Sequence, residues 1–196
     1  MDKINTEQKI LLKAIQLFSE KSFSEISTQN LADASGTNKA LIHYYYRSKQ
    51  NLFEKSFAFI IQDFLKAMIP VFEKNEDFLD KISRLIDSLL DYKKKHPLYI
   101  NMMARELKRN PSLVNLFNDN LPVTFKKGVL NFYRRINEAI ETRKIRQVHP
   151  RDLLEMIITL CFSDILMGNF YDGMFGKTAR QLPNETIKST LIQLLN

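Results

Sequence analysis

The chain has 196 residues, of which 44% are hydrophobic and 26% are charged, a composition typical of a globular protein and not of a disordered chain. Its 5 glycines and 6 prolines are too few for an all-β chain built from many tight turns. The formal net charge of +7 suits a polyanionic partner without requiring one. A lone cysteine, Cys161, cannot form an intramolecular disulfide and fits a reducing compartment.

Neither the start of the chain nor its apolar segments indicate a membrane. The first twenty residues alternate charged and apolar positions and lack the apolar core of a signal peptide. No window approaches the roughly 18 apolar residues of a membrane span. We therefore expect a cytoplasmic protein without a membrane partner.

The first part of the chain predicts two helices. Apolar residues from Ile10 to Phe18 recur at helical spacing, and Asn5 is placed to cap this helix. A short second helix is predicted over residues 29–35, with Thr28 as its N-cap. Gly36 then stands where a left-handed residue is needed to end a helix.

Helical spacing continues to the end of the chain. Another short helix is predicted from about Asn38 to Tyr45, and Ser48 caps a long one that Pro70 disturbs near its end. Prolines mark several later helix starts. The later helices are predicted at 78–96, 97–109, from 111 onward, at 122–143, at 152–169 and at 184–195. No segment alternates as a strand, so the predicted fold class is all-α.

The helix predicted at 152–169 is apolar around most of its circumference, so it must be buried on more than one side. One explanation is that it packs on its own core with one face and on a second subunit with the other. The alternative is the central helix of a monomeric bundle. If the chain forms a homodimer, we expect the interface to include seven residues of this helix and of the last one: Leu154, Ile158, Cys161, Ile165, Ile187, Leu191 and Leu195.

Residues 28–46 have the layout of a helix-turn-helix, which is a short helix, a tight turn with glycine and a second short helix. Ala32 and Ala34 supply small side chains where the two helices would cross. In the second helix, Leu41 and Ile42 can turn inward. Other helical hairpins with a glycine turn share this pattern, so the pattern alone does not establish DNA binding.

The stretch from residue 10 to residue 53 resembles the DNA-binding domain of the TetR family of bacterial transcriptional regulators. It reads ILLKAIQLFSEKSFSEISTQNLADASGTNKALIHYYYRSKQNLF. The resemblance is carried by Ala14, Leu17, Phe18, Phe23, Ile26, Thr28, Leu31, Ala32, Ser35, Gly36, Tyr45, Tyr46, Ser48, Lys49, Leu52 and Phe53. The chain departs from the usual family pattern at Ser22, Thr37, Ala40 and His43, the last of which replaces a tyrosine.

The resemblance implies that the helix beginning at Asn38 enters the major groove of double-stranded DNA. The predicted DNA-binding residues are Thr28, Thr37, Asn38, Lys39, His43, Tyr44, Tyr45 and Lys49. Thr28 and Lys49 lie at helix starts, where a phosphate is favoured. The leading edge of the recognition helix, from Thr37 to Lys39, is where base contacts usually lie.

Several of these roles have alternatives. Asn38 could serve only as a helix cap, and Lys39 could contact either guanine or phosphate. Tyr45 could be a core residue. If Lys49 contacts a phosphate, its replacement should lower the salt dependence of DNA binding by about one phosphate contact.

The resemblance further implies a DNA-binding domain at residues 4–50 and a helical effector-binding and dimerisation domain at 51–196. An apolar effector pocket could be lined by Tyr99, Met102, Met103, Phe117, Phe125, Tyr133 and Phe162. Any of these residues could instead belong to the core. We expect no metal site, because the three histidines are scattered and no second cysteine is present.

No catalytic motif or carboxylate pair is present, so we expect a protein without enzymatic activity or cofactor. The favoured function is a dimeric transcriptional regulator that binds operator DNA. The family implies that it is a repressor released by a small-molecule effector. The alternative is a helical interaction or scaffold protein whose basic face binds something other than an operator.

Overall fold

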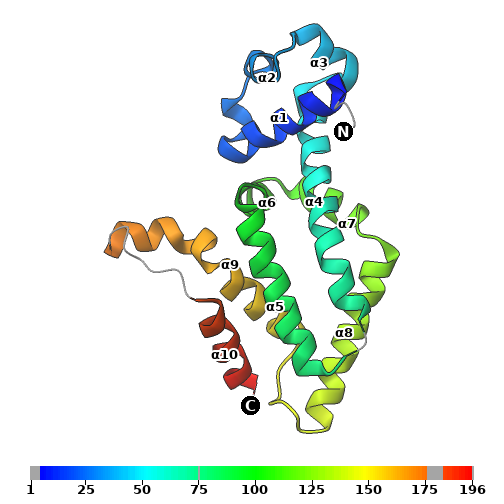
Figure 1. Ribbon diagram of the computed structural model, residues 1–196, viewed down its shortest axis with the longest axis vertical. Helices are drawn as coiled ribbons and strands as arrows, with labels where there is room; N and C mark the ends of the chain where they lie inside the picture. The colour runs from blue at the N-terminus through cyan, green and yellow to red at the C-terminus, as the bar shows by residue number, and fades with distance from the viewer. Residues whose placement is uncertain (1–4, 75, 176–182, 196) are drawn as a thin grey trace. The chain divides into compact units, whose positions relative to one another are not determined.

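The structure is a computed structural model. It describes residues 5–74, 76–175 and 183–195, with the side chains of residues 166–172, 174 and 175 left out. The described residues form α-helices and one short 3-10 helix, and none of them lies in a strand (Figure 1). The predicted all-α fold class is confirmed. Within the described part of the chain, no helix combines the length and the apolar character needed to cross a bilayer.

The helices follow the predicted order. Their bounds are α1 (Thr6–Glu20), η1 (Phe23–Glu25), α2 (Thr28–Ser35), α3 (Lys39–Tyr46), α4 (Lys49–Glu73), α5 (Phe78–Lys95), α6 (Pro97–Arg109), α7 (Pro111–Asp119), α8 (Val123–Glu141), α9 (Pro150–Phe175) and α10 (Asn184–Leu195).

Local side-chain chemistry explains several helix ends. Asn5 caps α1 as predicted, since its side-chain oxygen accepts from the Gln8 amide at 2.8 Å. The prediction of Thr28 as the cap of α2 is wrong, because Ser27 takes that place. The Ser27 hydroxyl accepts from the Asn30 amide at 3.1 Å, and the Asn30 side chain accepts from the Ser27 amide at 2.8 Å. This reciprocal pair is a capping box, which leaves Thr28 as the first helical residue.

Two helices continue further than the sequence pattern predicts. Pro70 lies inside α4, and its carbonyl oxygen accepts from the Lys74 amide at 3.3 Å. A proline removes only its own N–H group from the helix, so the turn that follows it can still form. Helix α9 runs to Phe175 instead of ending near residue 169.

The chain divides into two compact units. The first unit contains residues up to 63 and residues 98–120, and the second contains residues 64–97 and those from 121 onward. Helix α4 therefore contributes its first part to one unit and its last part to the other. The division predicted at residue 50 concerns function and stays a prediction.

An aromatic cluster forms the core of the first unit. The rings of Phe18 and Phe53 meet edge to face with centroids 5.0 Å apart, and the Phe23 ring centroid lies 5.1 Å from that of Phe53.

Arg105 of α6 caps the end of α1, because its guanidinium donates to the carbonyl oxygens of Phe18, Ser19 and Lys21. Helix α6 is thereby held to α1, which with α2 and α3 forms the three-helix segment called the head below.

The prediction that Ala34 lies where α2 and α3 cross is wrong, because Ala34 is exposed. Ala32, by contrast, is fully buried.

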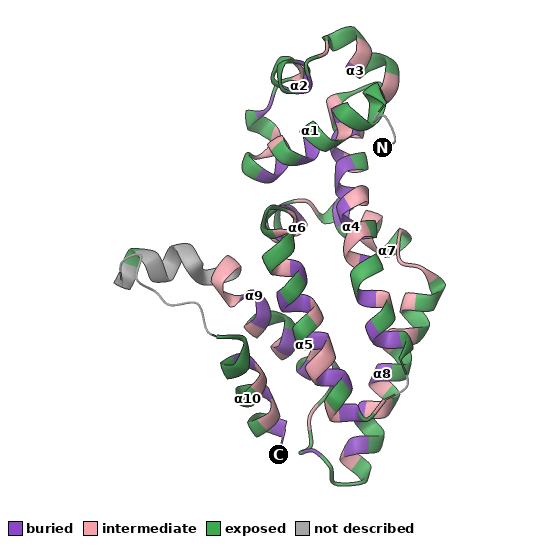
Figure 2. Ribbon diagram, in the orientation of Figure 1, coloured by how far each residue is buried: buried purple, intermediate pink, exposed green. Residues whose placement is uncertain are grey.

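Helix α5 is the central helix of the second unit and contacts α8, α9 and α10 (Figure 1). Its apolar stripe is buried (Figure 2). Lys93 of α5 donates to the Cys161 carbonyl at 2.7 Å and pairs with Asp164 at 3.0 Å. The run of lysines at the end of α5 is therefore not uniformly solvent-exposed, because its first member ties α5 to α9.

Four of the seven predicted interface residues belong to the core of the chain itself. Cys161, Ile187, Leu191 and Leu195 are between 0% and 3% exposed, so almost no surface remains on them for a partner. Burial also raises the pKa of the Cys161 thiol to about 12. For these four residues contact with a second subunit stays a prediction, and their burial within their own chain does not favour it. The reason is that α10 packs on α5 and α9 of the same chain and buries its apolar side there.

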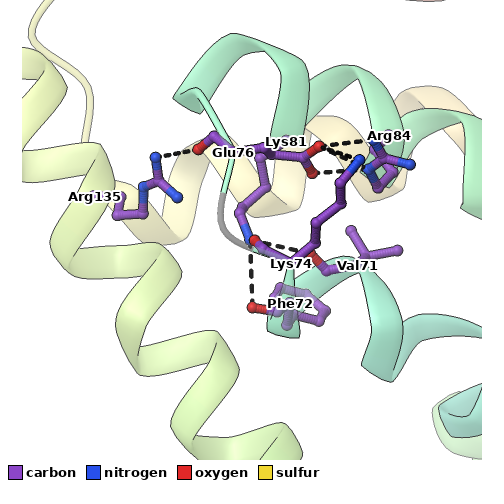
Figure 3. Close-up of polar contacts among 7 residues, drawn as sticks. All are labelled: Val71, Phe72, Lys74, Glu76, Lys81, Arg84 and Arg135. Atoms are coloured by element: carbon purple, nitrogen blue, oxygen red, sulfur yellow. Dashed lines mark hydrogen bonds and ion pairs between the residues drawn. The ribbon is translucent and has the colours of Figure 1, made fainter.

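A buried lysine closes the end of α4. Lys81 of α5 is 1% exposed, and its Nζ donates to the carbonyl oxygens of Val71 at 3.1 Å, of Phe72 at 3.3 Å and of Lys74 (Figure 3). The last carbonyls of a helix have no donor within the helix, and the negative end of the helix dipole favours a cation. Burial, assisted by the charge of Arg135, lowers the pKa of Lys81.

An ion-pair cluster surrounds this cap. Arg84 donates to both carboxylate oxygens of Glu76 at 2.7–3.0 Å, and Arg135 of α8 donates to the Glu76 carbonyl oxygen (Figure 3). Hydrogen bonds from Arg84, assisted by Lys74, lower the pKa of Glu76 to about 2. The turn between α4 and α5 is thus held from both sides by charged side chains.

We predict that Lys81→Met lowers the free energy of unfolding by about 2 kcal/mol, because buried carbonyl oxygens lose their donor. Urea unfolding followed by circular dichroism measures the change. Lys95→Met is the matched control on the same helix. Lys95 is exposed and pairs with Asp91 at 2.8 Å, so its loss should cost no more than about 0.5 kcal/mol. Equal unfolding midpoints for the two variants would show that the cap does not stabilise the fold.

Candidate nucleic-acid interface

The turn between α2 and α3 depends on a glycine. Gly36 has φ +62° and ψ +36°, a left-handed conformation that strains other residues. In this turn the Thr37 amide donates to the Ala32 carbonyl at 2.9 Å. Gly36 therefore ends α2 as predicted and sets the direction in which α3 leaves.

Helix α3 has one buried side and one exposed side. Ile42 is fully buried and Tyr46 is 4% exposed. The Tyr46 hydroxyl donates to the Glu7 carbonyl of α1 at 2.8 Å, and burial raises the pKa of Tyr46 to about 12. The Tyr46 hydroxyl thus fastens α3 to α1.

The exposed side of α3 carries a row of basic residues. Lys39 and His43 are exposed and four residues apart, so they lie along one side of the helix. Arg47, also exposed, follows four residues later as the C-cap, with φ +66°, and stands at the end of this row. Helix α3 contains no acidic residue. A row of this kind offers donors and positive charge to a polyanion.

Asn38 caps α3, and this restricts what else it can do. Its side-chain oxygen accepts from the Leu41 amide at 2.9 Å. Bidentate recognition of adenine by asparagine needs both the oxygen and the amino group of the side chain. While the cap is in place, one lone pair of the Asn38 oxygen is used within the protein, and the amino group is the part of the side chain without a role in the cap.

The two tyrosines that the sequence predicts to contact DNA differ in exposure. Tyr44 is 72% exposed, whereas Tyr45 is half-buried. Their rings meet edge to face with centroids 5.0 Å apart. Tyr45 therefore supports Tyr44, which has the freer hydroxyl group.

The two threonines that the sequence predicts to contact DNA lie at helix starts. Thr28 is the first residue of α2 and half-buried. Thr37, also half-buried, precedes the cap of α3, and its hydroxyl lies 2.8 Å from the hydroxyl of the buried Ser35. Contact of either residue with DNA stays a prediction.

Lys49 is turned toward the protein. Its Nζ donates to the carbonyl oxygens of Phe23 at 3.0 Å and Ile26 at 2.8 Å, and it lies 3.9 Å from the centre of the Phe23 ring. A cation above an aromatic face is attracted by the ring's quadrupole. This geometry makes Lys49 a positioning residue that holds η1 against the start of α4.

Two basic residues of this surface were missed in the sequence analysis. The four-residue spacing of Lys39, His43 and Arg47 would have pointed to Arg47. For Lys9 of α1, no spacing in the sequence indicates a place on this surface. Its Nζ lies 3.4 Å from the point where a Cβ of Gly36 would be, so only the folded chain brings it to the turn.

Comparisons with known proteins agree on one family. Residues 10–55 match the bacterial regulatory proteins of the tetR family. A protein of Bacillus subtilis named as a probable HTH-type transcriptional regulator, YttP, is 25% identical over 114 residues, which are 57% of this chain and 55% of that protein. Residues 10–55 are thus similar to the DNA-binding segment of the TetR family. The matched segment contains η1, α2 and α3 completely.

Two further similarities extend beyond the head. The nucleoid occlusion factor SlmA of Vibrio cholerae is 27% identical over 154 residues, covering 78% of this chain and 71% of SlmA. The fatty acid degradation regulator FadR of Bacillus halodurans has the same fold, with a TM-score of 0.67 at 16% identity over 98% of this chain and 97% of FadR. The chain spans about half the length of YttP.

The seven residues predicted to line an effector pocket fall into both units. Tyr99, Met102, Met103 and Phe117 lie in the first unit, and Phe125, Tyr133 and Phe162 lie in the second. Met102 accepts from the Ser19 hydroxyl at 3.7 Å, and Phe125 meets Phe72 edge to face at 5.2 Å. None of the seven residues lines either of two open hollows in the second unit. Their role in effector binding stays a prediction.

We predict that Lys49→Met weakens binding to all DNA sequences but leaves the slope of log affinity against log salt unchanged, because the ammonium is already used by protein carbonyls. The matched control is Lys39→Met, which removes an exposed cation and should lower the slope by about one phosphate contact. Titrations by fluorescence anisotropy at several salt concentrations measure both slopes. A lowered slope for Lys49→Met would instead support the phosphate contact expected from the sequence.

Proposed function

We propose that this protein is a transcriptional repressor that binds double-stranded operator DNA in a sequence-specific manner and is released by a small-molecule effector. One observation carries the DNA-binding part of this proposal. It is the exposed basic row of α3, mounted on a helix whose opposite side is buried and hydrogen-bonded to α1.

The chemistry of this surface suits the major groove. Lys39 at the start of α3 can donate to guanine O6 and N7 or to a phosphate. Tyr44 offers a hydroxyl group to the phosphate backbone, and Arg47 adds a charge at the far end of the row. Thr28 at the start of α2 is placed for a phosphate, since free amides and the helix dipole favour an anion there.

The division of labour along the chain is part of the proposal. Residues 4–50 would read DNA, and residues 51–196 would bind the effector and dimerise. Operator recognition by a helix-turn-helix dimer requires two recognition helices about 34–36 Å apart. An effector that changes this separation would release DNA.

Three interface residues remain available for dimerisation. Ile158 is 47% exposed, and Leu154 and Ile165 are half-buried. At 3.6 residues per turn, these three residues of α9 lie within about 40° of one another. A single strip of partly exposed aliphatic residues on a long helix suits packing against the same strip of a second copy.

Repression and effector release rest on the family alone. Among the relatives, SlmA is named as a nucleoid occlusion factor, so the similar proteins do not all carry the name of a repressor. The scaffold alternative is disfavoured, because the family match covers the segment that forms the basic surface of α3.

We predict that the full-length protein binds the DNA flanking its own coding region and that binding survives a large excess of nonspecific competitor, as operator binding does. A gel shift with the competitor measures this. Transcription in vitro from the bound promoter should fall when the protein is added. Complete displacement by the competitor would contradict sequence-specific binding, and specific binding without an effect on transcription would contradict repression.

We predict that Ile158→Asp shifts the protein from dimer to monomer, because a buried unpaired carboxylate in an apolar interface is strongly unfavourable. Sedimentation equilibrium at micromolar concentration measures the molecular mass. Leu130→Asp is the matched control, since Leu130 is a 69% exposed aliphatic residue of α8 outside the proposed interface. A dimer of unchanged stability in Ile158→Asp would exclude this strip as the interface.

A further inference from the structure

His43 and Arg47 close a ring of two hydrogen bonds at the end of α3. The Arg47 amide donates to the His43 carbonyl oxygen at 3.0 Å. In return, Nδ1 of His43 lies 2.8 Å from the Arg47 carbonyl oxygen. A carbonyl oxygen can only accept a hydrogen bond, so Nδ1 must carry the hydrogen.

The backbone of Arg47 maintains this arrangement. Arg47 has φ +66° and ψ −45°, a conformation that residues other than glycine rarely adopt. Such a residue persists only where its surroundings hold it. Here the carbonyl oxygen of Tyr46 accepts from the Ser48 amide at 2.7 Å and from the Asn51 side chain at 2.8 Å. These bonds fasten the turn on both sides of Arg47.

A fixed tautomer decides what the other ring nitrogen can do. When the imidazole is neutral and Nδ1 carries the hydrogen, Nε2 is an acceptor only. Phosphate oxygens also only accept, so neutral His43 cannot hydrogen-bond to the DNA backbone. In the major groove the donors are the N6 amino group of adenine and the N4 amino group of cytosine.

We propose that His43 determines specificity at one operator position by accepting a hydrogen bond, through Nε2, from the amino group of adenine or cytosine. The inference rests on the proposed function, because it needs α3 in the major groove. A protonated imidazole makes Nε2 a donor. Protonation therefore turns the preference toward guanine O6 or thymine O4.

The charged residues around His43 are mostly cations. Lys39 and Arg47 lie one turn away on either side of His43. Among the charged residues of the elements around α3, Asp33 lies in α2, Glu7 and Lys9 lie in the first part of α1, and Lys49 begins α4. These six residues comprise four cations and two anions. Bound DNA adds phosphates, which carry the opposite charge.

The experiment is binding-site selection from a randomised duplex library with the full-length protein, at about pH 8 and about pH 5.5, on either side of the range in which imidazole changes charge. At one position the wild type should favour adenine or cytosine at the higher pH. That preference should fall by about three- to tenfold or reverse at the lower pH, the effect of one net hydrogen bond. His43→Gln, which cannot titrate, should abolish the pH dependence at that position alone.

His149→Gln is the matched control. His149 is exposed and precedes α9 in the second unit, so this variant should keep the wild-type pH dependence. Three results would overturn the inference while leaving the proposed function intact. The first is that the wild type and His43→Gln show the same base preferences and the same pH dependence. The second is that guanine or thymine is selected at the higher pH at the position that His43→Gln affects, and the third is that His149→Gln loses the pH dependence. A wild type that selects no sequence at either pH would overturn the proposed function as well.

Discussion

The exposed basic surface of this protein depends on how the opposite side of α3 is anchored. Ile42 is fully buried in the head, and the Tyr46 hydroxyl donates to the Glu7 carbonyl of α1 at 2.8 Å. A helix of only eight residues is marginal in water by itself. Burial of one side and the hydrogen bond to α1 hold it, so Lys39, His43 and Arg47 are presented on a firm support.

Cations serve two separate purposes in this chain. Lys49, Lys81 and Arg105 donate to backbone carbonyl oxygens at helix ends and turns. Lys39 and Arg47 are exposed at the surface of the head. The net charge of +7 therefore overstates the charge available to a polyanion, because part of it holds helix ends and turns in place.

The helix ends show which structural features a local sequence pattern predicts and which depend on other parts of the fold. Gly36 and Asn5 were predicted correctly because their roles depend only on adjacent backbone. Ser27 displaced Thr28 as a cap because two neighbouring hydroxyl residues can compete for one position, and the capping box with Asn30 decides between them. Likewise, the apolar spacing of α10 identified a buried face but not the element that buries it.

The sequence by itself determined the all-α class, the order of the helices and the helix-turn-helix with its resemblance to the TetR family, because spacing, caps and turn residues act over a few positions of the chain. Only the tertiary structure decided that Lys49 turns inward, that Lys9 reaches Gly36 and that α10 packs on its own chain. Each of these contacts joins residues far apart in the sequence. Which partner a long side chain or an apolar face selects depends on what the fold brings within a few ångströms of it.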